Sequence, residues 1–255
     1  SVQLTGLDLG NYTAIGMRSS DENFTLALNF TTFTVSKTYS NFVVLSTNVE
    51  YATLTEAVAN SGEDDTIYIK NGIYKDIGIV ISNKTLDLIA LEGAVFDAQG
   101  HDGNFIIVQE TAEVTISGIT FRGINNRNTN YGAIVNHGYL TVNSCNFTDN
   151  KIKKISFAEN GGAAIFSDGE LLEIDNCNFI NNVAPLKAST AAVTSLGYED
   201  VSITSSRFIN NTAREGGALH FKNLIQFESA VASCDFEQNT AVKGSAIYVG
   251  NNSRY

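Results

Sequence analysis

The segment Cys145-Asn146-Phe147-Thr148-Asp149-Asn150 is the first of four similar copies in the second half of this 255-residue chain. In each copy a small residue is followed two positions later by phenylalanine and five positions later by asparagine, as in Cys177–Asn182, Ser206–Asn211 and Cys234–Asn239. A weaker copy ends at Phe121, and the successive phenylalanines are 26, 32, 29 and 28 residues apart. A unit recurring at this spacing predicts a stacked repeat.

A second pattern, small residues followed by an aliphatic residue, falls between these copies. Its members are Gly132-Ala133-Ile134, Gly161-Gly162-Ala163-Ala164-Ile165, Ala191-Ala192-Val193, Gly216-Gly217-Ala218-Leu219 and Gly244-Ser245-Ala246-Ile247. The intervening apolar runs are short and end at Gly, Asn or Asp, without the long helices that usually connect parallel strands. The sequence therefore predicts an all-β fold, a right-handed parallel β-helix in which each short strand stacks on its counterpart one coil later.

The alternation of side chains along a strand predicts which of them point inward. Leu140, Val142, Cys145 and Phe147 are expected inside, together with the aliphatic members of the second pattern, whereas Asn146 is expected outside. The last asparagine of each copy is expected at a bend, where its amide can bond turn backbone and the neighbouring coils. This ladder would comprise Asn150, Asn182, Asn211 and Asn239.

The N-terminal part of the chain differs from the rest. Residues 1–48 lack the repeat, and their alternating polar and apolar residues predict a strand-rich cap or the remnant of a preceding domain. The β-helix is expected over residues 49–255. Near its start, Thr53-Leu54-Thr55-Glu56 is a capping box that predicts a short helix closing near Gly62. Such a helix would cover the otherwise exposed core of the first coil.

Composition limits the classes of partner. A net charge of −11 with dispersed lysines and arginines argues against nucleic acid and against anionic membranes. No run approaches the roughly 18 apolar residues of a membrane span, so we expect no membrane insertion within this segment. No cationic and apolar leader opens the chain, which we interpret as a mature or recombinant piece of a larger protein. No cofactor is predicted.

The three cysteines share one repeat position. Cys145, Cys177 and Cys234 occupy a column that Ile119 and Ser206 fill in the other copies, so we expect small buried side chains there. Stacked strands lie about 4.8 Å apart, and this spacing would also permit a disulfide between Cys145 and Cys177. The spacing of a zinc site is absent.

Two segments resemble a known family. Tyr51–Val58 and Gly62–Tyr74 are similar to the opening coils of pectin-lyase-like β-helices, in particular those of the adhesin-like surface proteins of methanogenic archaea. The later phenylalanine and glycine patterns are also similar to those of chlamydial polymorphic outer-membrane proteins. The resemblance covers roughly residues 50–250. It implies a secreted or cell-surface adhesion protein and names no site residue.

The same fold carries polysaccharide lyases and glycoside hydrolases, so an enzyme of either class is an alternative that depends on the catalytic residues present. A hydrolase requires paired carboxylates roughly 5 to 10 Å apart. The column of Asp149 instead continues with Asn181, Asn210 and Gln238. The remaining candidates are Asp97, His101 and Asp102 in a glycine-rich loop, where they can equally be loop polar residues.

Other titratable residues have structural interpretations. Asp64-Asp65 is interpreted as a turn entering the first coil rather than as a metal site. His137 and His220 fall in different columns without a serine or cysteine nucleophile in register, and both are interpreted as solvated surface residues. We therefore predict no catalytic residue and no metal ligand.

A binding surface has its own signal. The residue after each inward aliphatic of the second pattern should face outward, which predicts an exposed stripe containing Phe166, His220 and Tyr248. The alternatives are that a loop or another domain covers this stripe, or that the alternation is inverted.

Seven Asn-x-Ser/Thr sequons are candidates for glycosylation if the chain is secreted through a glycosylating pathway. They are Asn11, Asn23, Asn29, Asn83, Asn146, Asn210 and Asn251.

The sequence thus predicts an extracellular, non-catalytic, adhesin-like glycoprotein domain of a larger anchored archaeal protein. It would bind a glycan or protein of another cell through the outer face of the β-helix. The alternatives are a polysaccharide lyase or glycoside hydrolase, and a structural stalk or spacer.

Overall fold

The computed structural model describes residues 41–127, 129, 131–153, 160–184, 189–196, 200–222 and 231–250, and the backbone of two strands nearer the N-terminus. Those two strands, β1 (Gly10–Arg18) and β2 (Ala27–Val35), pair antiparallel. They belong to a first unit, Ser1–Tyr39, and Ser40–Tyr255 forms the second.

The boundary predicted at residue 48 falls inside the second unit. The reason is β3 (Phe42–Val44), which pairs antiparallel with β4 (Val49–Tyr51) and with β5 (Asp65–Ile69), the first strand of the stacked coils. Phe42 and Val44 are fully buried in the same core as the coils. Residues 41–48 therefore belong to the second unit, where β3 lies at the edge of the first strand of the coils.

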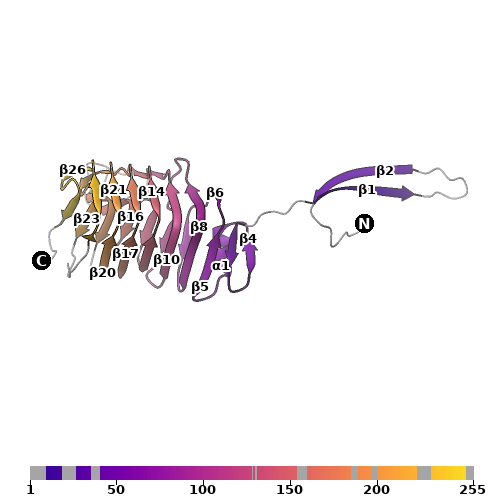
Figure 1. Cartoon of the computed structure of the whole chain (residues 1–255), viewed down its shortest axis with the longest axis horizontal. Helices are drawn as coiled ribbons and strands as arrows, with labels where there is room; N and C mark the ends of the chain where they lie inside the picture. The colour runs from indigo at the N-terminus through magenta and orange to yellow at the C-terminus, as the bar shows by residue number, and fades with distance from the viewer. Residues whose placement is uncertain are drawn as a thin grey trace, which may run out of the picture. The chain divides into compact units, whose positions relative to one another are not determined.

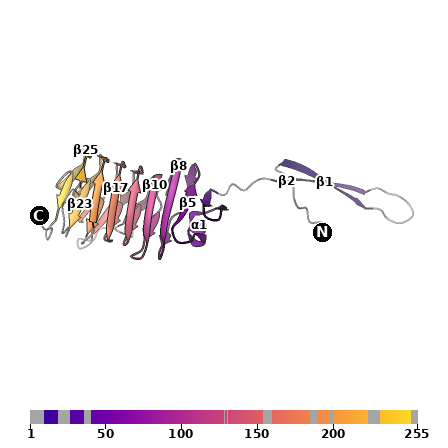
Figure 2. The ribbon, with the colours of Figure 1, turned by 60° about the horizontal axis from the view of Figure 1, so that its bottom comes forward.

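The second unit is a parallel β-helix, as predicted. One seven-stranded sheet takes a strand from each successive coil, and Figures 1 and 2 show such strands lying side by side. In chain order these strands are β7 (Ile79–Ile81), β9 (Ile106–Val108), β12 (Ile134–Asn136), β16 (Asn160–Ser167), β19 (Ser189–Leu196), β23 (Leu219–Lys222) and β27 (Ile247–Val249).

A fourteen-stranded sheet forms the other two faces of the coils. It is continuous because β8 (Thr85–Asp97) and β10 (Glu113–Arg122) run through both faces. One face adds β13 (Tyr139–Asn143), β17 (Leu171–Asp175), β20 (Asp200–Thr204) and β24 (Val231–Ala232) to β5. The other contains β6 (Gly72–Tyr74), β14 (Asn146–Thr148), β18 (Asn178–Ile180), β21 (Arg207–Ile209) and β25 (Asp235–Glu237).

Two short two-stranded parallel sheets also stack between successive coils. They pair β11 (Asn125–Asn126) with β15 (Lys151–Ile152), and β22 (Thr212–Glu215) with β26 (Thr240–Lys243). The side-chain alternation along the coils matches the prediction, because Leu140, Val142, Cys145 and Phe147 are all fully buried in one core.

The repeated phenylalanines form a stack through that core. The ring centroids of Phe147 and Phe179 lie 4.9 Å apart, those of Phe179 and Phe208 4.7 Å, and those of Phe208 and Phe236 5.1 Å, with nearly parallel planes. The cysteine column lies beside the stack. Its three thiols are free, and Cys145 and Cys177 are buried as expected. The disulfide between Cys145 and Cys177 that the spacing would permit is therefore not formed in this structure.

The asparagine ladder is present, and Asn150, Asn182 and Asn211 are buried. The backbone N–H and the side-chain amide of each of these three residues donate to the Oδ1 of the asparagine one coil later, at 3.2 Å from Asn150 to Asn182 and at about the same length in the next two coils. Each side-chain amide also donates to the phenylalanine carbonyl of the preceding coil. The ladder thus satisfies polar groups that a tight bend would otherwise bury unpaired.

The predicted capping helix is α1 (Leu54–Asn60). The Thr53 hydroxyl accepts from the Glu56 N–H, and the Glu56 carboxylate accepts from the Thr53 N–H, which completes the capping box. Leu54 and Ala57 are fully buried against the first coil. The helix therefore covers this end of the solenoid, and Figure 1 shows it beside β4.

Candidate functional site

The predicted exposed stripe is not exposed. Phe166 retains 2% of its accessible surface and His220 retains 1%, whereas Tyr248 is half-buried. Phe166 is absent from the main hydrophobic core that contains its neighbour Ile165, in agreement with the predicted outward direction of its side chain. The prediction that these side chains face solvent is wrong for Phe166 and His220.

Other parts of the chain lie over this outward column. The ring of Phe166 packs on Tyr131, at 4.4 Å between centroids, and Tyr131 belongs to the segment that precedes β12. The hydroxyl of Thr194, in the same column, donates to the Gly161 carbonyl at 2.7 Å. Cover by another segment, one of the alternatives left open by the sequence, therefore applies to Phe166.

His220 is held in a neutral state. Burial lowers its pKa to about 4, and the nearby Glu215 carboxylate only partly opposes that effect. Its ring lies 5.4 Å from that of Tyr248. Among the described residues no group forms a hydrogen bond with its buried Nδ1. The interpretation of His220 as a solvated surface histidine is therefore wrong.

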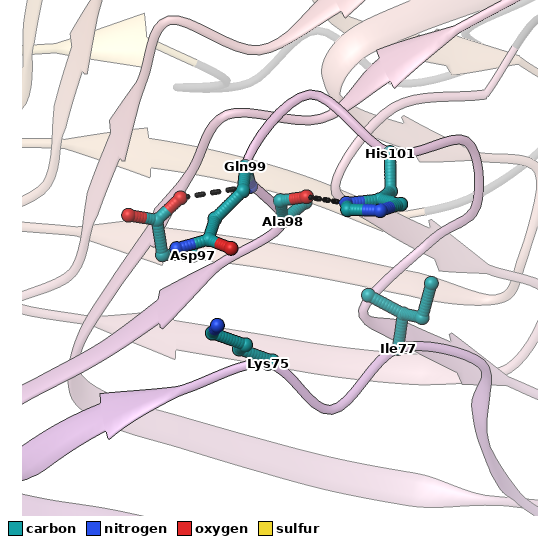
Figure 3. Close-up of a pocket in the computed structure, with 6 residues that line it drawn as sticks. All are labelled: Lys75, Ile77, Asp97, Ala98, Gln99 and His101. Carbon is teal, nitrogen blue, oxygen red and sulfur yellow. Dashed lines mark hydrogen bonds between the residues drawn. The ribbon is translucent and has the colours of Figure 1, made fainter.

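A surface hollow of about 260 Å³ lies at the corner of the first two coils. Figure 3 shows Lys75 and Ile77, which follow β6, on one side and the loop after β8 on the other. His101 Nδ1 donates to the Ala98 carbonyl at 2.7 Å, which leaves Nε2 as a hydrogen-bond acceptor. The hollow therefore combines the exposed aliphatic side chain of Ile77 with an amine, an amide and an imidazole. Its lining residues are Lys75, Ile77, Asp97, Ala98, Gln99 and His101.

Asp97 is committed to structure within this hollow. Although burial opposes it, hydrogen bonds from the Gln99 N–H and from Arg122 lower the pKa of the Asp97 carboxyl, and the Lys75 charge adds to the effect. Its oxygens lie 2.9 Å from the Gln99 nitrogen and 2.8 Å from an Arg122 guanidinium nitrogen. An ionised carboxylate held by a guanidinium is suited to fixing the loop rather than to general acid catalysis.

The other two candidates in this loop, His101 and Asp102, lie in different surroundings. Asp102 does not line the hollow, and its carboxylate accepts from the Arg127 N–H at 2.9 Å. His101 does line it. The loop therefore brings together Asp97 and His101 of the three residues considered from sequence.

Three exposed aliphatic side chains lie close together in the sequence of the first coil, and one of them, Ile77, lines the corner hollow. Ile73 in β6 is 64% exposed, Ile77 is 38% exposed and Val80 in β7 is 50% exposed. All three lie in one stretch of the first coil. Apolar side chains are thus exposed along this stretch, whereas Phe166 and His220 in the outward column of later coils are buried.

A second hollow of about 220 Å³ was missed by sequence reasoning. Its His137 Nδ1 lies 2.5 Å from an Asp168 carboxylate oxygen, and Glu110 and Glu170 complete the lining. The sequence contains a signal for this pair. His137 directly follows β12 and Asp168 directly follows β16, and the register of these two strands pairs Asn136 with Ser167. His137 is thus partly exposed but is paired with a carboxylate.

Asp65 has a structural role. Its carboxylate accepts hydrogen bonds from the Ser46 hydroxyl and from the N–H groups of Ser46, Gly62 and Thr66. Asp64 adopts a positive φ of 54°. These contacts agree with the prediction of a turn. Within the described ranges, no three His, Cys, Asp or Glu side chains converge in a way that could hold a metal ion.

Three sequons lie in described coils. Asn83 and Asn210 are exposed, and Asn146 is half-buried with its amide donating to the Thr120 hydroxyl. The side chains of Asn11 and Asn29, and the whole of Asn23 and Asn251, lie outside the described residues. Glycosylation stays a prediction. No helix of the described chain is long and apolar enough to cross a membrane.

Comparison with known proteins gives one distant likeness. A stretch of 140 residues, 55% of this chain, is 31% identical to metabotropic glutamate receptor-like protein R of Dictyostelium discoideum. The chain spans only 8% of that protein's length, so the likeness assigns no family. No family model matches the chain, and no solved structure matches it. The resemblance to archaeal adhesin-like proteins stays a prediction.

Proposed function

We propose that the solenoid is an extracellular, non-catalytic, adhesin-like domain of a larger anchored surface protein. It binds a glycan or a protein of another cell through its outer face. Two findings support this role: the parallel β-helix, which presents long outer faces, and the likeness of a part of the chain to a receptor-like protein.

The corner hollow is the observation that carries the proposal. The exposed side chain of Ile77 suits the face of a sugar ring or an aliphatic side chain, and Gln99, His101 and Lys75 supply hydrogen-bonding groups beside it. Such a contact is weak by itself. Many copies of the domain on one cell would raise the overall avidity without any new contact.

The test is binding of the purified protein to intact candidate cells and to a glycan array. An Ile73→Ser/Ile77→Ser double variant removes two exposed aliphatic side chains of the first coil, one of which lines the hollow. Val242→Ser is the matched control, because Val242 is 65% exposed in β26 of the last described coil. We expect saturable binding that the double variant weakens by about tenfold or more and that the control leaves unchanged.

Absence of binding to every cell and glycan would refute the receptor role and favour the stalk or spacer. Equal losses in the double variant and the control would refute the assignment of the binding face while leaving the adhesin role. Circular dichroism and thermal unfolding of each variant distinguish these results from misfolding.

The second hollow favours one alternative function, a polysaccharide lyase or hydrolase. The imidazole of His137, paired with Asp168 and flanked by Glu110 and Glu170, contains groups that transfer protons in such enzymes. The measurement is release of reducing ends and unsaturated products from a panel of polysaccharides. Activity that His137→Ala abolishes would establish the enzyme and contradict a non-catalytic domain.

A further inference from the structure

The three sequons of the described coils use their side-chain nitrogens differently. At Asn146, Nδ2 donates to the Thr120 hydroxyl at 3.3 Å, and Oδ1 accepts from the Asn178 amide at 2.9 Å. At Asn210, Nδ2 donates to Asn181 Oδ1 at 2.8 Å. Both nitrogens therefore already serve hydrogen bonds between stacked coils.

Asn83 is held by its oxygen instead. It is exposed, with a positive φ of 54°, in the turn between β7 and β8. Its backbone N–H donates to the Thr111 hydroxyl oxygen at 3.1 Å, and that hydroxyl donates to Asn83 Oδ1 at 2.8 Å. Within the ranges that the structure describes, no group accepts a hydrogen bond from Asn83 Nδ2. The turn therefore fixes the carboxamide and leaves its nitrogen without a partner.

The second residue of each sequon shows how firmly the fold holds the segment. Phe147, after Asn146, is fully buried in β14, which pairs with β10 on one side and β18 on the other. Asn211, after Asn210, is a fully buried member of the asparagine ladder. Lys84, after Asn83, is only half-buried and precedes β8.

An enzyme that recognises a sequon must reach both the asparagine and the hydroxyl two positions later. The Asn146 sequon is the whole of a central strand, whose backbone groups are already bonded to two neighbours. The Asn83 sequon ends at Thr85, the half-buried first residue of β8, and no part of the described chain bonds the Thr85 hydroxyl. Access therefore favours the turn at Asn83 over the strand at Asn146.

A glycan on Asn83 is compatible with the fold. N-glycosylation replaces one hydrogen of Nδ2 and leaves Oδ1 as an acceptor, so the bond from Thr111 can persist. To reach an enzyme, Asn146 must instead leave its ladder and break two hydrogen bonds. The accessible fraction of such a residue is lower by about tenfold or more.

We propose that Asn83 is the acceptor of an N-linked glycan in the folded solenoid, and that Asn146 and Asn210 stay unmodified. In the transfer, Asn83 Nδ2 forms a bond to the anomeric carbon of a lipid-linked oligosaccharide. The bond from that carbon to the lipid phosphate breaks, the phosphate leaves with its electron pair, and Nδ2 gives up one proton. The donor requires the extracellular location of the proposed function, whereas the choice of acceptor depends only on the fold.

The test is glycan transfer to the purified, folded full chain by a single-subunit oligosaccharyltransferase with a lipid-linked oligosaccharide. Mass spectrometry of the glycopeptides measures occupancy at each site. We expect occupancy at Asn83 to exceed that at Asn146 and at Asn210 by about tenfold or more.

Free peptides separate the effect of the fold from that of the local sequence. Synthetic peptides covering residues 80–88, 143–151 and 207–215 contain the same three sequons without the coils. All three peptides should be modified to a similar extent. In the full chain, Thr85→Val should abolish modification of Asn83, and Thr85→Ser should retain it, because only the serine keeps the hydroxyl of the sequon.

Two results would overturn the proposal. One is an unmodified Asn83 in the folded chain. The other is an occupancy at Asn146 or Asn210 that equals that at Asn83, or the same ranking of the three sites in the free peptides, which would show that the fold does not select the site. Cell binding is measured separately, so its absence would refute the adhesin role and leave the acceptor site unaffected.

Discussion

Protonation of His220 should destabilise the solenoid in acid. The pKa of His220 is lowered by burial from 6.5 to about 4, so the folded state resists a proton that the unfolded chain accepts. The stability that neutral His220 contributes is therefore fully present above the pKa of the unfolded state. It is lost as the pH falls from about 6.5 to about 4. The difference between the two pKa values corresponds to about 3 kcal/mol, of which about 2 kcal/mol should be lost by pH 5.

The assay is urea unfolding, followed by circular dichroism, at several pH values between about 7.5 and 4. Carboxylates such as Asp65 and Asp97, whose pKa values are lowered, also lose stabilising interactions in acid. A His220→Gln variant isolates the histidine, because it keeps those carboxylates and removes the ring. The difference in unfolding free energy between wild type and variant should fall by about 2 kcal/mol between pH 7.5 and 5.

A difference that is independent of pH would refute the reasoning, since it would place the pKa of His220 near its ordinary value. Direct titration by NMR checks the same quantity. A His220 resonance that titrates near 6.5 in the folded protein would show that the side chain is solvated.

Three further predictions concern the coils and their cap. Asn182→Ala should lower the free energy of unfolding, measured with urea, by about 3 kcal/mol, because it leaves the buried donors of Asn150 unpaired. Its control is Asn178→Ala, at a half-buried outward position, which should lower the same quantity by less than about 1 kcal/mol. Phe179→Ala should cost about 3 to 5 kcal/mol, since it opens a cavity between two stacked rings, and a loss below about 1 kcal/mol would contradict the stacked core. Thr53→Ala should lower the unfolding free energy by about 1 kcal/mol through loss of the helix cap, and an unchanged thermal midpoint would show that the cap does not contribute.

Much of the fold could be predicted from local patterns. The recurring Phe147 and Asn150 positions specify a stacked coil, because only in-register stacking places each phenylalanine on a phenylalanine and each asparagine on an asparagine. Alternation specified which side chains leave the core. The capping box at Thr53 specified where α1 begins. These features depend on near neighbours along a strand or at a fixed repeat distance, which the sequence displays directly.

The candidate site depended on distant segments. His137 and Asp168 are 31 residues apart, and they meet because one coil brings the ends of β12 and β16 together. The corner hollow likewise joins the turn at Ile77 to the loop at His101. Irregular turns between strands have no repeat spacing, so their contacts could not be read from the pattern.

The sequence by itself determined the repeat, the parallel β-helix, the inward columns and the capping helix. Tertiary structure alone decided which outward residues reach solvent. Alternation states the side of a strand on which Phe166 or His220 lies, but solvent exposure depends on whether another segment passes over that side. For Phe166 that segment includes Tyr131, which is 35 residues away and belongs to the preceding coil. Burial is a sum over all surrounding atoms, whereas alternation is a property of one strand.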